Sequence, residues 1–135
     1  PRFDAADAKL EAGDFVGAVA EFDKLLAETP GDRTAVAGRA QAGLLARVSE
    51  IDQKAVVAAL QSDPDDFETQ MQAADIEMLG GQIEAAFTRL VGLVRMTTGD
   101  EKDQARLRVL ELFDTMDPAD PVVLKARREL ATALY

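Results

Sequence analysis

The sequence predicts an all-α protein, an α-solenoid of about four antiparallel helix pairs, which is about eight helices. Ala6, Ala40 and Ala74 are spaced 34 residues apart, and so are Pro30 and Pro64. A fixed period of this length is typical of stacked helical repeats. Between the repeated positions, apolar residues follow the i, i+3, i+4, i+7 spacing of an amphipathic helix. No apolar/polar alternation persists long enough to favour a strand.

Glycine, proline and aspartate divide the first half of the chain into four expected helices. Gly13 ends the first helix, and Pro30-Gly31 ends the second, whose apolar residues run from Phe15 to Leu26 at helical spacing. Asp32 is a good cap for the third helix. The four expected helices span about 3–12, 15–28, 33–48 and 52–61.

The second half contains four more expected helices. Asp63-Pro64 begins the first of them, with Pro64 in the opening turn and Asp65 or Asp66 as alternatives for the cap. Gly80-Gly81 ends that helix, and residues 97–100 form the next break. Asp120-Pro121 begins the last helix with a cap followed by a proline. The first of these four helices runs from about residue 63 to Gly80-Gly81. The other three span about 82–96, 101–116 and 120–134.

The period and its residues resemble the tetratricopeptide repeat, a helix–turn–helix unit of 34 residues. Ala18, Phe22 and Pro30 match the A-x3-F…P pattern of that repeat. Arg47 replaces an expected Gly and Asp52 an expected Ala, so the second unit is degenerate. We expect one domain over residues 1–135, with approximate units 1–31, 32–64, 65–99 and 100–135.

Composition excludes several classes of function. The net charge of −10 argues against a nucleic-acid partner, and no run approaches the roughly 18 apolar residues of a membrane span. The chain has no Cys, His or Asn. The absence of Cys and His excludes catalysis by a thiolate or a histidine, and we expect no metal site and no cofactor. Asp63, Asp65 and Asp66 flank a turn, where helix capping explains them better than a two-carboxylate enzyme or a calcium loop.

The end of the chain carries a second resemblance. It reads Leu-Glu-Leu-Phe up to Phe113, Asp-Pro-Val-Val from Asp120, and Arg-Arg-Glu-Leu-Ala-Thr-Ala-Leu-Tyr from Arg127. This order resembles the tail of the thioredoxin-like co-chaperones, also called chaperedoxins, which join an N-terminal thioredoxin-like domain to a C-terminal tetratricopeptide region. The segment Glu-Ala-Gly-Asp-Phe-Val-Gly-Ala-Val-Ala-Glu-Phe over residues 11–22 is similar to their first repeat.

The resemblance implies a fragment of a longer cytoplasmic protein, with the N-terminal thioredoxin-like domain missing. Such a protein holds unfolded clients and hands them to a chaperonin of the GroEL type. The resemblance places a docking surface for the chaperonin on the last helix, at Arg127, Arg128, Leu130, Leu134 and Tyr135. Alternatively, the two leucines face the core, the arginines complement the helix dipole, and Tyr135 covers the last core layer, which is the favoured interpretation of that residue.

The concave face of a tetratricopeptide array is the other candidate binding surface. Its expected contacts in this chain are Gln41, Leu44, Met71, Asp75 and Met78. Met71 and Met78 lie seven residues apart on one helix face, and flexible thioethers suit a surface that accepts varied apolar segments. The alternative is that both methionines pack on the neighbouring helix. A groove that grips a carboxylate through Asn and Lys is disfavoured, since the chain has no Asn.

The sequence therefore predicts a non-catalytic protein-interaction module that buries an unfolded client segment on a concave helical face. The alternative is a tetratricopeptide scaffold or oligomerisation domain with one specific protein partner. Self-association is compatible with both hypotheses, because the ends of a solenoid expose apolar surface.

Overall fold

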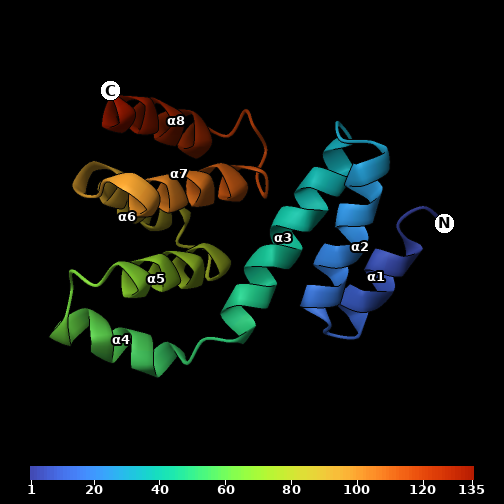
Figure 1. Cartoon of the computed structure of the whole chain (residues 1–135), viewed down its shortest axis with the longest axis horizontal. Helices are drawn as coiled ribbons and strands as arrows, with labels where there is room; N and C mark the ends of the chain where they lie inside the picture. The colour runs from blue at the N-terminus through green and yellow to red at the C-terminus, as the bar shows by residue number, and fades with distance from the viewer.

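A computed structural model describes all 135 residues and contains eight α-helices and no strand (Figure 1). The predicted all-α fold is therefore confirmed. The helices are α1 (Asp4–Glu11), α2 (Phe15–Glu28), α3 (Arg33–Ser49), α4 (Gln53–Ser62), α5 (Phe67–Leu79), α6 (Ile83–Met96), α7 (Gly99–Phe113) and α8 (Pro121–Leu134).

Aspartate side chains cap five of the eight helices. Asp32 accepts a hydrogen bond from the Ala35 amide at the start of α3, and Asp120 accepts one from the Val122 amide at the start of α8. Both were expected caps, and Pro121 occupies the first turn of α8 as predicted. These acceptors satisfy backbone donors that have no partner within the helix.

Two helices have boundaries that differ by more than one residue from the sequence prediction. The α5 helix begins at Phe67, so Pro64 lies outside it, and Asp66 rather than Asp65 is the cap, accepting from the amide and hydroxyl of Thr69. Favourable capping by Asp66 selects the later start. The α7 helix begins two residues earlier than expected, at Gly99, and ends three residues earlier, at Phe113.

The residues that repeat in the sequence occupy equivalent places in the fold. Ala6, Ala40 and Ala74 are all buried, as expected for small residues that let helices approach closely. Gly13 and Gly81, two periods apart, both have positive φ, at 74° and 86°. Glycine adopts this left-handed conformation without steric cost, so it suits the turn after the first helix of a unit.

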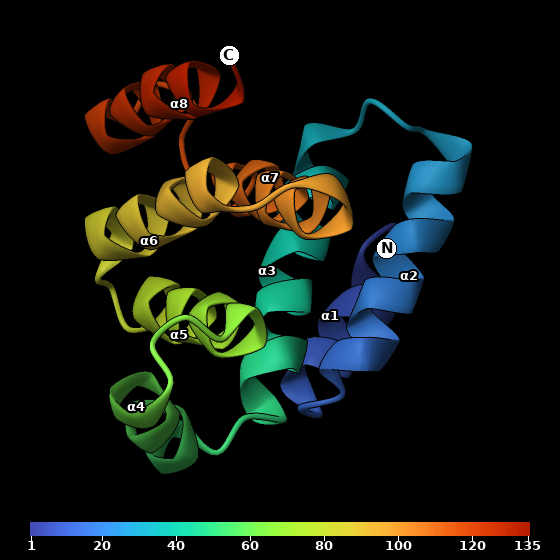
Figure 2. The ribbon, with the colours of Figure 1, turned by 60° about the vertical axis from the view of Figure 1, so that its left-hand side comes forward.

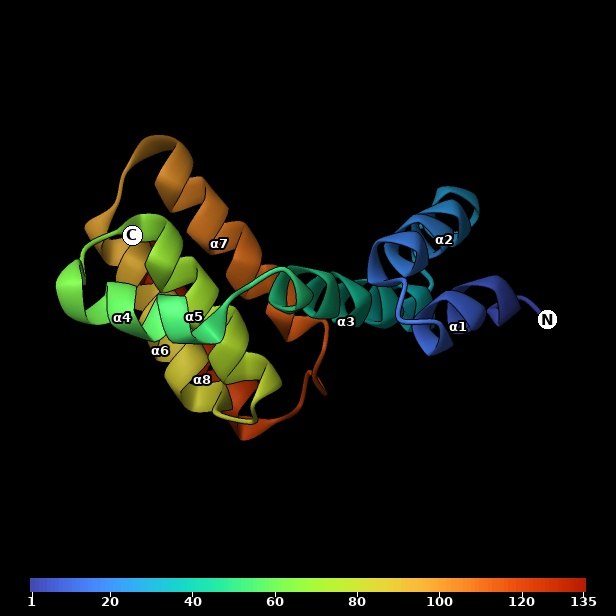
Figure 3. The ribbon, with the colours of Figure 1, turned by 90° about the horizontal axis from the view of Figure 1, so that it is seen from below.

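The core is divided into two clusters that meet at α3. The larger cluster is built by α5, α6, α7 and α8, and α3 contributes Leu44 and Val48 to it. The smaller cluster joins α1 and α2 to Ala35 and Ala42 of α3. Seen from below, α3 runs between the α1–α2 pair and the block formed by α4 to α8 (Figure 3). This long helix therefore connects the two parts of the core.

Contacts between the helices are uneven. The α3 helix packs chiefly on α2, α4 packs on α5, and α8 packs on α6 (Figure 2). The contact between α2 and α3 is close because Gly38 lies under the Phe22 ring. A Cβ atom at Gly38 would lie 2.4 Å from two ring carbons, so a larger residue there would require the Phe22 ring to move.

Candidate functional site

A groove of about 450 Å³ lies between α2 and α3 on one side and α7 on the other. Leu26 of α2, Val36 of α3 and Leu110 of α7 contribute apolar surface, and Met71 of α5 also lines it. Leu107 of α7 lines the same groove with half of its side chain exposed to solvent. The groove therefore offers accessible apolar surface in a chain whose net charge is −10.

A network of ion pairs fixes the three helices α3, α5 and α7 around this groove. The Asp75 carboxylate of α5 is 1% exposed. It accepts from Nε and Nη2 of Arg47 at 2.9 and 3.2 Å, and from Nη1 of Arg108 at 2.6 Å. Arg47 also donates to Glu111 of α7 at 2.8 Å. Because Arg47 binds Asp75 through two nitrogens, the pair fixes geometry as well as charge.

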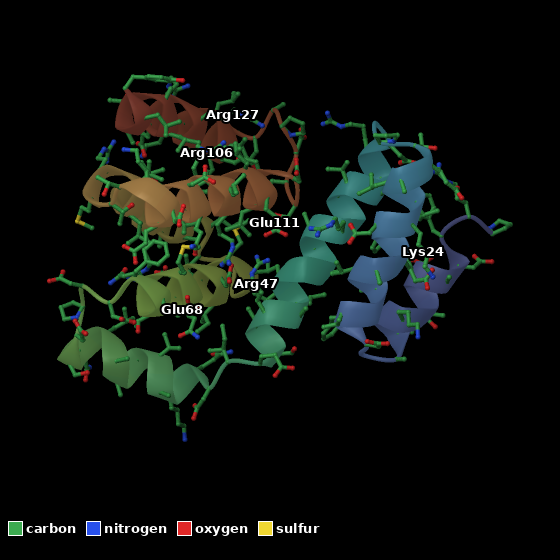
Figure 4. All side chains as sticks on the ribbon, in the orientation of Figure 1. Lys24, Arg47, Glu68, Arg106, Glu111 and Arg127 are labelled. Carbon is green, nitrogen blue, oxygen red and sulfur yellow. The ribbon has the colours of Figure 1, made fainter.

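The network continues to the second helix through Arg39. This arginine forms salt bridges with Asp23 of α2 and, at 3.5 Å, with Glu111 of α7. Gly43 of α3 faces the same carboxylate, and a Cβ atom there would lie 3.0 Å from Glu111 Oε1. Figure 4 shows Arg47 and Glu111 pointing toward each other between α3 and α7. The charged groups therefore connect four helices across the groove.

Burial and pairing shift the protonation equilibria of this region. Desolvation lowers the pKa of Arg108, although Asp75 opposes the shift. Desolvation also acts on Arg47, but its bonds to Asp75 and Glu111 outweigh that effect and raise its pKa. Burial raises the pKa of Asp114 at the groove edge, against the attraction of Arg33 and Arg127. Arginine side chains stay charged near neutral pH, so both guanidinium groups can form ion pairs with the carboxylates beside them.

A second hollow, of about 420 Å³, lies on the other side of the network. Arg47, Asp75 and Arg108 line it together with Val16 and Ile51. Arg108 lines both hollows, so the ion pairs stand between them. No group of three or more carboxylates has an arrangement that could hold a metal ion.

The structure does not gather the five expected groove residues on one open face. Met71 lines the first hollow and Asp75 the second, although both side chains are buried. Gln41 is exposed on α3. Leu44, Met71 and Met78 all belong to the larger core cluster. This corrects their expected placement on an open face and agrees with the alternative that the methionines pack on neighbouring helices. The methionines are buried because α5 is enclosed by α3, α4, α6 and α7, and Leu44 is buried because α3 packs on α5 and α7.

The expected docking residues of the last helix are also partly buried and partly exposed. Leu130 is buried in the larger cluster and Leu134 packs against it half-buried, as the alternative interpretation of these leucines holds. The guanidinium of Arg127 lies 4.5 Å from the centre of the Phe113 ring, a cation–π contact. Arg128 and Tyr135 are exposed, which corrects the expectation that Tyr135 covers the core. As the last residue it extends beyond α8.

Sequence reasoning did not find the ion-pair network. Arg39, Arg108 and Glu111 were not singled out, and Arg47 was interpreted as a sign of degeneracy in the second unit. The available signal was Arg47 itself. This arginine stands where the repeat has a glycine, and in the structure it pairs with the buried Asp75 of α5.

Comparisons with known proteins agree with this architecture. A family model described as "Tetratricopeptide repeat" matches residues 46–135. Uncharacterized proteins from Mycobacterium tuberculosis strains H37Rv and CDC 1551 and from Mycobacterium bovis are 42% identical over 135 residues, which is 100% of this chain and 44% of theirs. The chain thus spans less than half the length of the curated relatives it matches. No solved structure matches significantly.

Tetratricopeptide folds are typically non-catalytic modules that bind other proteins. Their helices are amphipathic rather than apolar throughout. None of the eight helices here combines the length and the apolar character that crossing a bilayer requires.

Proposed function

The chain belongs to the tetratricopeptide-repeat family, and from this premise we propose that the groove between α3 and α7 binds an extended or unfolded segment of a client protein. The observation that supports the proposal is the position of Leu107, a large apolar side chain left half-exposed in a concave surface. Burying such a side chain against a client gives favourable free energy in proportion to the apolar area removed from water.

The rigid frame of the groove also favours binding. Arg39, Arg47 and Arg108 are engaged by carboxylates of their own chain. Their charges therefore do not have to be desolvated without a partner when a client covers them. A frame that is already ordered loses little conformational entropy when a ligand binds.

Leu107→Glu is expected to raise the concentration of protein needed to suppress aggregation of a denatured client by about tenfold. Burial of a leucine contributes about 1.5–3 kcal/mol, roughly half of which is still available at Leu107. The measurement is light scattering of two unrelated chemically denatured proteins during dilution.

Leu79→Glu is the matched control for this experiment. Leu79 is 39% exposed, against 50% for Leu107, and it lies at the far end of α5 without lining the groove. It should change the effective concentration by less than about twofold. Equal effects of the two substitutions, with unchanged helicity, would contradict the assignment of binding to the groove.

The finer proposal is a co-chaperone that holds unfolded clients in the cytoplasm and passes them to a chaperonin. The resemblance of the chain end to the thioredoxin-like co-chaperones supports it, and in that family a thioredoxin-like domain precedes the repeats. A holding function requires suppression of aggregation for both unrelated clients. Failure with both, combined with tight binding of a single natural protein, would favour a scaffold or oligomerisation domain.

The proposed chaperonin contact lies on the exposed side of α8. Arg127, Arg128 and Tyr135 are exposed there, whereas Leu130 is buried in the core. Because Arg127 already contacts the Phe113 ring, Arg128 and Tyr135 are the better candidates. Arg128→Glu is expected to weaken binding to a purified GroEL-type chaperonin by at least fivefold, because a charge reversal opposes the proposed contact.

The chaperonin affinity can be measured by surface plasmon resonance. Arg95→Glu provides the control, since Arg95 is an exposed arginine near the end of α6. Unchanged affinity of the Arg128 variant would remove this residue from the proposed docking surface. Loss of client holding in the same variant would show that the effect is not specific to the chaperonin.

A further inference from the structure

Another hollow, of opposite character, adjoins the groove at one residue of α7. Gln104 of α7 lines both the apolar groove and a hollow of about 580 Å³ at the turn between α4 and α5. This neighbouring hollow is therefore within reach of the same bound segment. The inference below rests on the function proposed for the groove and concerns the chemistry of its client.

The neighbouring hollow is lined almost entirely by carboxylates. It is formed by Asp63, Asp65, Asp66, Glu68 and Glu101 with Phe67 and Gln104, and no basic residue lines it. Asp66 is engaged in capping α5. The other four carboxylates form no salt bridge within the chain, whereas the arginines of the apolar groove are paired with acids. The chain thus leaves negative charge uncompensated at this end.

Apolar surface adjoins these carboxylates. A recess of about 410 Å³ is lined by Phe67, Leu93 and Met96, and also by Asp65 and Glu101. Met96 is 74% exposed, so most of its thioether remains free for contact. Lysine and arginine side chains complement such a recess, because their aliphatic parts pack on apolar surface while their charged groups stay beside the carboxylates.

We propose that the client segment is apolar in its middle and carries lysine or arginine at one end. The apolar side chains lie in the groove between α3 and α7. The cationic side chain enters the recess beside Met96 and is held near Asp65 and Glu101. Charge complementarity of this kind increases the association rate and sets the register of a bound segment, and the same carboxylates repel acidic segments.

Two fluorescently labelled 12-residue peptides test the proposal with the intact chain. They share one apolar core of leucine and alanine. One peptide carries Lys-Lys at both ends, and the other carries Glu-Glu at both ends. Fluorescence anisotropy gives their affinities at low and high salt. The lysine peptide is expected to bind about tenfold more tightly, with a preference that falls at high salt as exposed charges are screened.

The double substitution Asp65→Asn/Glu101→Gln is expected to weaken binding of the lysine peptide about three- to tenfold, the combined effect of two exposed ion pairs. Asp7→Asn/Glu11→Gln is the matched control. It removes the same two charges from α1, where both carboxylates are exposed and unpaired, and should leave the preference for lysine intact. Equal effects of the two double variants would indicate a response to net charge and overturn the proposal.

The design separates this inference from the function proposed for the groove. If both peptides bind equally well and Leu107→Glu weakens binding of both, the groove binds clients, and the proposal that the client carries a basic end is overturned. If neither peptide binds, both proposals are overturned. If the lysine peptide is preferred and Leu107→Glu has no effect, the acidic recess binds cations without the apolar groove, which also contradicts the composite site.

Discussion

Asp75→Ala is expected to lower the free energy of unfolding by about 2–4 kcal/mol. Removing one partner of a buried ion pair typically costs about 3–5 kcal/mol, because the remaining charge is left without compensation. The lower range applies here because Arg47 and Arg108 keep some contact with solvent and Glu111 still pairs with Arg47. Urea unfolding followed by circular dichroism measures the change.

The effect of Asp75→Ala should exceed that of removing an exposed pair. Asp103 forms a salt bridge with Arg106 one turn away on the surface of α7, and Asp103→Ala should cost less than about 0.5 kcal/mol. In the Asp75 variant the two guanidinium groups would repel each other across the vacated position. A loss below about 1 kcal/mol for Asp75→Ala would show that the network is not important for stability.

Phe22→Ala is expected to open α1 and α2 while the helices of the larger cluster stay folded. Phe22 is 4% exposed, and the four other buried residues of the smaller cluster are all alanines. Most of the buried apolar volume is therefore its ring, and replacing a buried phenylalanine by alanine costs about 3–5 kcal/mol. The other large apolar residues of this cluster, such as Leu10 and Leu25, are only partly buried, so local unfolding of α1 and α2 should absorb most of this loss.

Amide hydrogen exchange read by mass spectrometry distinguishes local from global opening. The Phe22 variant should exchange rapidly over residues 4–28, with protection over residues 67–134 reduced much less. Phe87→Ala provides the contrast, because it removes a ring from the larger cluster. The centre of the Phe87 ring lies 5.0 Å from the centre of the Phe113 ring there. Equal loss of protection in both regions of the Phe22 variant would indicate one cooperative unit rather than two parts joined by α3.

Much of the fold could be predicted because it depends on local signals. Gly13, Asp32 and the Asp120-Pro121 pair define helix ends through their own backbone chemistry, and the structure has those ends as expected. The start of α5 was less certain, since three nearby aspartates compete for one cap. The structure resolves this competition through the two hydrogen bonds that Asp66 accepts from Thr69.

The candidate site was harder to predict because it depends on how helices distant in sequence are packed. Met78 was assigned to the concave face from its repeat position, but packing around α5 buries it. Arg47 and Glu111 are 64 residues apart and meet only when α3 and α7 are brought together. Repeat position identifies the helix face, whereas the degree of burial depends on the crossing angles and on neighbours that deviate from the consensus.

Amide hydrogen exchange of the protein with and without a saturating unfolded client shows directly which helices the client covers. If the client binds in the groove, protection increases over residues 104–111 of α7 and 36–40 of α3, with little change on α8. Client-induced protection confined to α8, or absent from both groove segments despite confirmed binding, would contradict the claim that this groove is the protein-binding surface.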